Sequence, residues 1–300
     1  MTPLLSIGDL RVGLKQGATS HPLIKDVSFD IMPGETYGLV GESGSGKSVT
    51  SLAVMGLLKK PLQVLGGEIR FRDRNLLALS RREMRALRGR RIAMVFQEPM
   101  TALNPLVTVG RQIAEMYSLH QGKSRSEAEK LAVEALASVR VPSPERRATD
   151  YPHQMSGGLR QRVMIAMALA CNPDLLIADE PTTALDVTVQ AEVLKLIREL
   201  CAARGTAVLF ISHDLGVIAE MCQRVGVMYA GCLVEENDTA ALFAQPRHEY
   251  TRGLLGALPR MGSRLEHGRR RLVDIDSVIK DRSVLTATRF ITPRPEGATG

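Results

Sequence analysis

Short apolar runs recur along most of the chain, and segments with helical spacing separate them. The runs cover residues 35–40, 92–96, 175–179 and 207–212, and three of the four are almost continuous in apolar side chains. Strands have this pattern when helices cover both faces of a parallel sheet. The sequence therefore predicts an α/β fold with a mainly parallel sheet flanked by helices.

The helix expected after the third run has the clearest period. Its apolar residues recur at spacings of three and four: Val189, Val193, Leu196, Ile197 and Leu200. Gly205 supplies a left-handed stop just past the end of this helix. We expect this apolar face to form part of the core.

Three sections depart from the alternation. Residues 1–30 contain short β-like pieces, which predict a small antiparallel sheet, and residues 110–147 predict inserted helices. One domain is expected over 1–258, with a helical subdomain at approximately 98–172. Periodicity fades beyond it, so residues 259–300 are expected to form a weakly ordered basic tail.

Charge and cysteine content narrow the class of protein. The net charge is +7, but residues 246–300 alone hold eleven Lys and Arg against six Asp and Glu, so most of the excess lies near the C-terminus. With no Trp and 4% aromatic residues, platforms for stacking bases are scarce, and no nucleic-acid partner is expected. The four cysteines contain no C-x-x-C pair, which favours buried free thiols over a zinc site or disulfide framework.

Membrane crossing is not expected of this sequence. No stretch free of charged residues reaches the roughly 20 apolar residues of a spanning helix. Residues 1–9 lack the basic start and apolar core of a signal peptide. The chain is therefore expected in the cytosol or on a membrane surface.

Residues 41–48 fit the phosphate-loop pattern G-x-x-x-x-G-K-[ST], between a predicted strand and the predicted helix 49–58. Its glycines let backbone N–H groups turn towards a phosphate, Lys47 reaches the outer phosphates, and the Ser48 hydroxyl is a ligand for Mg²⁺. The expected nucleotide-binding residues are Gly41, Glu42, Ser43, Gly44, Ser45, Gly46, Lys47, Ser48 and Val49.

Two further motifs suit phosphate chemistry. Asp179 and Glu180 end an apolar strand, where Asp179 would hold Mg²⁺ through water and Glu180 would orient the attacking water. Ser156, Gly157 and Gly158 precede an apolar helix and offer a second anion site. Taken alone, the first motif is more often a solvated strand end, and the second a capping turn.

The order of these motifs resembles the nucleotide-binding subunit of an ATP-binding cassette (ABC) transporter over roughly residues 4–258. It also includes Gln97, the segment 184–186 and the segment 211–214. The resemblance implies that Gln97 senses Mg²⁺ and the membrane partner, that His213 contacts the γ-phosphate, and that Asp186 belongs to a loop crossing to a second subunit. It further implies that Ser156–Gly158 act in trans, so that two subunits enclose two ATP molecules.

Three segments are similar in sequence to the dipeptide, oligopeptide and nickel importer branch of this family: residues 96–105, 160–162 and 246–255. The resemblance implies a bacterial ATPase on the cytoplasmic face of the inner membrane, peripherally bound, with ATP and Mg²⁺. Expected partners are a second ABC ATPase subunit, two permease subunits and an extracytoplasmic solute-binding protein. Three departures stand out: Val12-Gly13-Leu14 replaces an adenine-stacking aromatic, Leu159 replaces a common Gln, and no cysteine follows Cys232.

Two other functions remain open at this point. An export or lipoprotein-release ATPase would share every catalytic residue, and only the segments 97–105 and 246–255 argue against it. A cassette ATPase acting on DNA or ribosomes would need a second cassette or a long coiled coil, and no sustained heptads occur between Ser48 and Ser156. The solute stays open among peptides, nickel and other small molecules.

Overall fold

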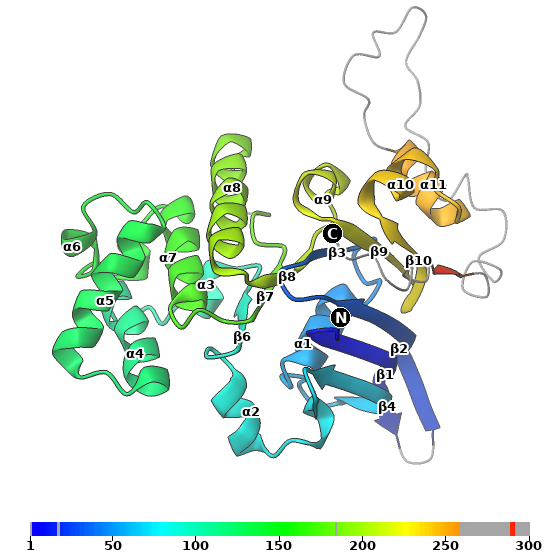
Figure 1. The fold of residues 1–300 in the computed structure, drawn as a ribbon, viewed down its shortest axis with the longest axis horizontal. Coiled ribbons are helices and arrows are strands. Elements are labelled where there is room, and N and C mark those ends of the chain that lie inside the picture. Colours follow the sequence, from blue (N-terminus) through cyan, green and yellow to red (C-terminus); the bar gives the residue numbers. More distant parts are fainter. Residues whose placement is uncertain (1, 17–18, 184, 258–288, 292–300) are drawn as a thin grey trace, which may run out of the picture.

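The fold is built on a seven-stranded mixed sheet, in a computed structural model that describes residues 2–16, 19–183, 185–257 and 289–291. The strand order is β11-β10-β9-β3-β8-β7-β6, and β9, β3, β8, β7 and β6 run parallel (Figure 1). The strands are β3 (Thr36–Val40), β6 (Ile92–Val95), β7 (Leu175–Asp179), β8 (Ala207–Ile211), β9 (Arg224–Tyr229), β10 (Cys232–Asp238) and β11 (Phe290–Ile291). The prediction of a mainly parallel sheet is confirmed.

A second, antiparallel sheet lies beside the first, in the order β2-β1-β4-β5. Its strands are β1 (Leu5–Gln16), β2 (Thr19–Ile31), β4 (Leu62–Phe71) and β5 (Arg74–Asn75). The sequence predicted the part built from residues 1–30 but missed β4. Gly66 and Gly67 interrupt the alternation of that strand, and its register against β1 shifts there.

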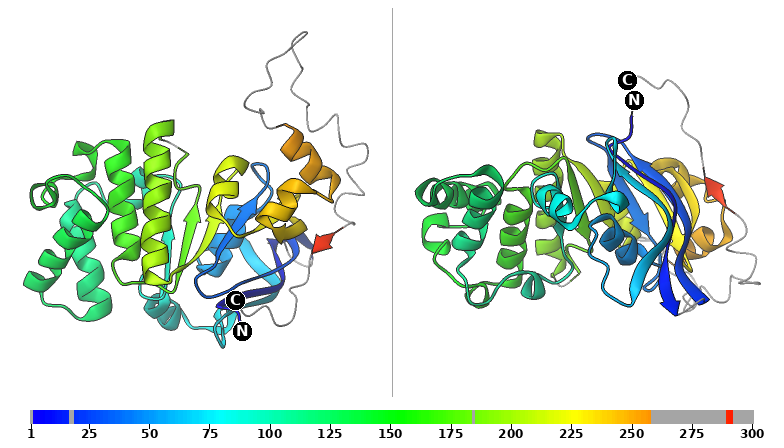
Figure 2. Two further views of the ribbon diagram at one scale, coloured as in Figure 1. Left: turned by 45° about the horizontal axis from the view of Figure 1, so that its top comes forward. Right: turned by 90° about the horizontal axis from the view of Figure 1, so that it is seen from below.

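Helices cover the large sheet and form a separate lobe. The lobe contains α4 to α7, at the left of Figure 1, and confirms the inserted helices expected within 110–147. Figure 2 shows the same lobe from two other sides. The helices are α1 (Lys47–Val54), α2 (Arg81–Leu87), α3 (Pro99–Ala102), α4 (Val109–Gln121), α5 (Arg125–Ser138), α6 (Pro144–Arg147), α7 (Gly157–Leu169), α8 (Val187–Arg204), α9 (Leu215–Met221), α10 (Thr239–Ala244) and α11 (Glu249–Gly256), with short 3₁₀ turns at Leu76–Ala78 and Pro152–Gln154.

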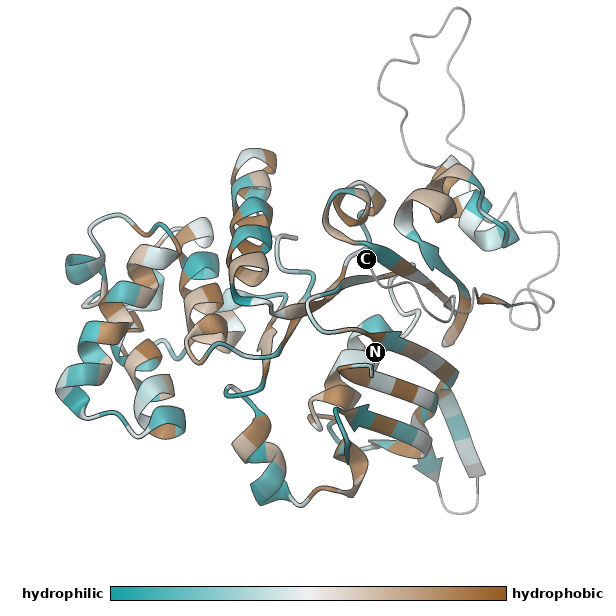
Figure 3. Ribbon diagram, in the orientation of Figure 1, coloured by the Kyte–Doolittle hydropathy of each residue, from teal (hydrophilic) through white to brown (hydrophobic). Residues whose placement is uncertain are grey.

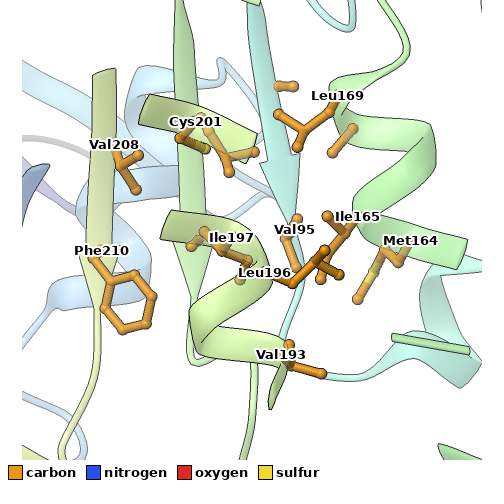
Figure 4. Packing of buried hydrophobic residues seen from close by; sticks show 14 of the residues in the cluster. Val95, Met164, Ile165, Leu169, Val193, Leu196, Ile197, Cys201, Val208 and Phe210 are labelled. Carbon is orange, nitrogen blue, oxygen red and sulfur yellow. The ribbon is translucent and has the colours of Figure 1, made fainter. Parts of the chain in front are cut away.

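The core has two parts, one on each face of the large sheet. Alternate residues of each buried strand belong to different parts: Val208 and Phe210 of β8 face one cluster, whereas Leu209 and Ile211 face the other. Figure 4 shows the apolar face of α8 on the first side, where Leu196 lies beside Val95 and Ile165. Helix α8 ends with Gly205 at φ 65°, so the predicted left-handed stop is confirmed. Figure 3 shows the resulting apolar strands between helices of mixed polarity.

The described helices include none that is long and apolar enough to span a membrane. Of the segment expected to form a basic tail, the structure describes residues 289–291, where β11 pairs in parallel with β10. Residues 259–288 and 292–300 of that segment lie outside the described residues.

Candidate active site

The phosphate loop follows β3 and ends in the first turn of α1, as its sequence context predicted. Gly41 has φ 147°, and a Cβ at this position would lie 2.2 Å from the Met228 carbonyl oxygen. A side chain is therefore excluded on two grounds, the backbone conformation and the contact with β9. This close approach places the loop against the end of the sheet.

Lys47 folds back over the loop. Its side chain is buried, and Nζ donates to the carbonyl oxygens of Gly41 at 2.7 Å and Glu42 at 2.9 Å. Burial lowers the pKa of Lys47, while the carboxylates of Glu180 and Asp179 oppose this shift. The buried ammonium of Lys47 is a positive charge that can pair with a phosphate.

Oxygen atoms gather around Asp179 at the end of β7. The Ser48 hydroxyl donates to Asp179 Oδ1 at 3.0 Å, and the Ser51 hydroxyl donates to Oδ2 at 3.4 Å. Asp179 is buried, and desolvation raises its pKa. A hydroxyl beside a buried carboxylate is the hard oxygen donor set that suits Mg²⁺, and a cation would offset the desolvation of the charge.

Glu180 lies where three segments meet. Gln97, after β6, donates from Nε2 to Glu180 Oε2 at 3.0 Å, and Nδ1 of His213, after β8, lies 3.2 Å from Oε1. The Glu180 backbone has φ 46°, and its N–H donates to the Ile211 carbonyl at 2.9 Å. The structure thus brings together Gln97, Glu180 and His213, which the sequence placed at three separate strand ends.

The segment Ser156–Gly158 lies apart from the phosphate loop. Ser156 caps α7, because its Oγ accepts the Leu159 N–H at 3.4 Å, and Gly157 lines a cavity of about 160 Å³ together with Gln97 and Leu185. Within the described part of the chain, no hydrogen bond joins residues 156–158 to residues 41–49. Asp186 caps α8 by accepting the Val189 N–H at 3.0 Å.

The residues that depart from the family pattern lie in or beside apolar parts of the structure. Val12 is fully buried in β1, and Leu14 is half-buried two residues on. Leu159 packs at the border of the apolar cluster that also contains Phe210. The cysteines are free thiols, three of them buried, and no group of metal-ligating residues occurs among the residues described.

Sequence reasoning missed two contacts of the phosphate loop from distant segments. In the turn between β9 and β10, the Gly231 N–H donates to the Ser45 carbonyl at 3.0 Å. In α11, the Tyr250 hydroxyl accepts the Glu42 N–H at 3.0 Å. Gly231 carried a local signal, since a glycine marks a tight turn. Tyr250 lies in the segment 246–255, whose resemblance indicated the importer branch but not this contact.

Known proteins are similar to this chain in both sequence and fold. A probable peptide ABC transporter ATP-binding protein of Sinorhizobium fredii is 56% identical over 257 residues, which cover 85% of this chain and 77% of the relative. The dipeptide transport ATP-binding protein DppD of Bacillus subtilis is 49% identical over 262 residues, which cover 87% and 78%.

A solved structure has the same fold. It is an ATP-binding cassette solved as a dimer in a post-hydrolysis state with ADP and Pi, and it matches with a TM-score of 0.70 at 29% identity, covering 78% of this chain and 98% of that one. The sequence profile of ABC transporters matches residues 24–183, and that of the oligopeptide/dipeptide transporter C-terminal region matches residues 234–277. The chain therefore belongs to the ABC transporter family of ATPases and carries the C-terminal region of the oligopeptide/dipeptide branch.

Proposed function

We propose that this chain hydrolyses ATP to drive the import of peptides through separate permease subunits. The printed names of the relatives, a peptide ABC transporter protein and a dipeptide transport protein, support peptides over nickel or another small solute. The match of residues 234–277 to the oligopeptide/dipeptide C-terminal region supports the same branch and argues against an export ATPase.

The observation that carries the proposal is the convergence of Lys47, Asp179 and Glu180 at one edge of the sheet. Asp179 contacts Ser48 of the phosphate loop, and Glu180 follows it directly. This edge is where parallel α/β sheets bind ligands. Residues 41–49 would surround the phosphates of ATP, and Lys47 would neutralise charge on the outer ones.

In hydrolysis, water attacks the γ-phosphorus, a new P–O bond forms, and the bond to the bridging oxygen of ADP breaks. Glu180 would orient the water and accept its proton, since its carboxylate follows directly after Asp179, which would hold Mg²⁺. Gln97 and His213 contact the two oxygens of that carboxylate from the ends of β6 and β8, the strands on either side of β7. Ser48, Gln97 and, through water, Asp179 would hold Mg²⁺, which would supply neutralisation of the charge that develops on the phosphates.

A second cassette subunit would complete each site. Ser156, Gly157 and Gly158 make no described hydrogen bond to the chain's own phosphate loop, which agrees with their acting on the nucleotide of a partner. Asp186 would lie in the loop that crosses to that partner. Two permease subunits and an extracytoplasmic solute-binding protein would supply the path and the cargo. The chain would sit peripherally on the cytoplasmic face of a bacterial inner membrane.

The proposed domain organisation is that of one ABC ATPase domain. One ATPase domain would cover residues 1–258, and its helical subdomain would cover about 98–172, which includes α4 to α7. The residues beyond it would form an appended basic segment.

Glu180→Gln tests the function most directly. The substitution keeps the size of the side chain and removes its proton acceptor, so ATP binding should persist while turnover falls by about 10²-fold or more. The control is Glu220→Gln, a side chain that is 59% exposed and pairs with Arg198 on the surface. The assay measures steady-state ATPase activity and uptake of a labelled dipeptide in cells that carry the permease subunits.

Near-wild-type ATPase activity in Glu180→Gln would move the proton acceptor to another residue. Loss of ATPase activity with unchanged dipeptide uptake would disprove peptide import by this chain. The Glu220→Gln control should behave as the wild type in both assays.

A further inference from the structure

Tyr250 joins helix α11 to the phosphate loop. Its side chain is fully buried, and its hydroxyl accepts the Glu42 N–H at 3.0 Å across 208 positions of sequence. The ring packs against that of Tyr229 with centroids 4.5 Å apart. Burial raises the pKa of Tyr250, so the hydroxyl stays neutral at physiological pH. A rigid, neutral acceptor therefore faces the first turn of the loop.

The Glu42 N–H belongs to the same peptide unit as the Gly41 carbonyl. That carbonyl accepts from Lys47 Nζ at 2.7 Å. In a planar trans peptide, the N–H and C=O point in opposite directions. A hydroxyl that holds the N–H on one side therefore directs the carbonyl towards the ammonium on the other. We infer that Tyr250 is a positioning residue that sets the ATP affinity of the phosphate loop, by orienting the Gly41–Glu42 peptide and through it Lys47.

A buried network fixes the position of Tyr250. Glu235 of β10 is fully buried, and its two oxygens accept the N–H groups of Arg247 at 2.8 Å and His248 at 3.0 Å. His248 Nδ1 in turn accepts the Tyr250 N–H at 3.2 Å and so caps α11. Hydrogen bonds inside a protein, away from water, restrict the groups that they join. The helix start is therefore anchored to the sheet, and Tyr250 is held at a defined place.

Tyr250 belongs to the C-terminal region and not to the ATPase motifs. Tyr250 lies within residues 234–277, which match the oligopeptide/dipeptide C-terminal region. Through this hydroxyl, a segment outside the ATPase motifs contacts the loop that would hold the phosphates. The turn between β9 and β10 supports the loop from the same side, since Gly231 N–H donates to the Ser45 carbonyl at 3.0 Å.

Tyr250 should act on binding more than on the chemical step. Glu180 would align the water, and Gln97 and His213 each contact its carboxylate. Among the described residues, no hydrogen bond or ion pair joins these three side chains to α11. Losing the hydroxyl leaves the Glu42 N–H without its acceptor and loosens one ligand of Lys47. We expect the Kd for ATP to rise about threefold to tenfold, with kcat within about twofold of the wild-type value.

The test compares Tyr250→Phe with Tyr229→Phe in the full chain. Both remove one hydroxyl from the same pair of packed rings, but only Tyr250 bonds to the phosphate loop. Binding of a fluorescent ATP analogue gives Kd, ATPase activity with the membrane partners gives kcat, and thermal unfolding reports stability. Glu235→Gln is a second variant, which loosens the anchor of α11 and leaves the hydroxyl in place; it should raise Kd by a smaller factor.

The inference rests on the proposed role of residues 41–49, and the two can fail separately. If the wild type does not bind the analogue, that role is wrong. If the wild type binds and Tyr250→Phe binds equally well, the positioning role is wrong. An equal rise in Kd for Tyr229→Phe, or a rise that disappears when the loss of folded protein is accounted for, would also overturn it, because ring packing would then explain the effect.

Discussion

Arg224 forms the most buried ionic cluster described in this structure. Its guanidinium pairs with Glu35 at 3.1 Å and with Glu236, donates to the Asp30 carbonyl at 3.2 Å, and lies 5.4 Å from the centre of the Tyr37 ring. The Arg224 side chain is 14% exposed and that of Glu236 is 4% exposed. Arg224→Met keeps the apolar stem of the side chain and removes its charge.

The expected loss follows from the burial of Glu236. Removing one partner of a buried pair leaves an uncompensated charge and costs about 3–5 kcal/mol of unfolding free energy. For a chain of 300 residues, this corresponds to a fall in Tm of roughly 5–8 °C. The lost contact with the Tyr37 ring would add a smaller amount.

The loss of unfolding free energy in Arg224→Met should depend on pH, and Glu236 determines the direction of this dependence. Burial raises the pKa of this carboxyl, and Arg224 lowers it, so the substitution should raise the pKa further. The folded variant then binds a proton that the unfolded chain releases above about pH 4.3. Stability should therefore fall as the pH rises through the folded pKa, and the penalty should be smaller at pH 5 than at pH 7.5.

Denaturant unfolding of the wild type and the variant at both pH values measures this effect. The control is Arg198→Met, which breaks a surface pair with Glu220 whose side chains are 46% and 59% exposed, and which should cost less than about 1 kcal/mol. A loss for Arg224→Met no larger than that of the control, or one equal at the two pH values, would refute the assignment of an electrostatic penalty to Glu236.

Three further predictions concern the site. Lys47→Ala should reduce ATP binding and turnover together, because it removes the buried ammonium; normal hydrolysis in the reconstituted complex would contradict the phosphate-loop assignment. Ser156→Arg should abolish transport while this chain's own loop still takes a photoreactive ATP analogue, and full transport would argue against a site shared between subunits. Gly231→Ala should lower Tm by several degrees and weaken ATP binding, since a Cβ would lie 1.9 Å from the Leu23 carbonyl oxygen at a φ of 83°; an unchanged Tm would contradict it.

Local sequence determined the strands and helices that end at the candidate site. The apolar runs at 92–96, 175–179 and 207–212 predicted β6, β7 and β8 within a residue of their ends. Helix α8 was also predictable with its Gly205 stop. The apolar period of a helix or strand and the residue that ends it depend on neighbouring residues, so the local sequence predicts both.

The positions of the motif residues along the chain were predictable from local sequence, and the sheet topology brings these residues together. Gln97, Glu180 and His213 each come within two residues of the end of a parallel strand, and parallel strands place their ends at one edge of a sheet. The sequence thus placed these residues at strand ends, and the strand order, with β7 between β6 and β8, made them neighbours. It did not indicate that Gln97 and His213 would each approach a different oxygen of Glu180.

Only the tertiary structure decided what surrounds the phosphate loop and the ionic cluster. Tyr250 meets Glu42 across 208 positions, and Arg224 meets Glu35 across 189. Neither pair has a local pattern, because each depends on which strands become neighbours in the sheet: β9 lies between β3 and β10, and α11 is anchored to β10 through Glu235. A contact of this kind is set by the closing of long loops around a common core, and chain order alone does not specify it.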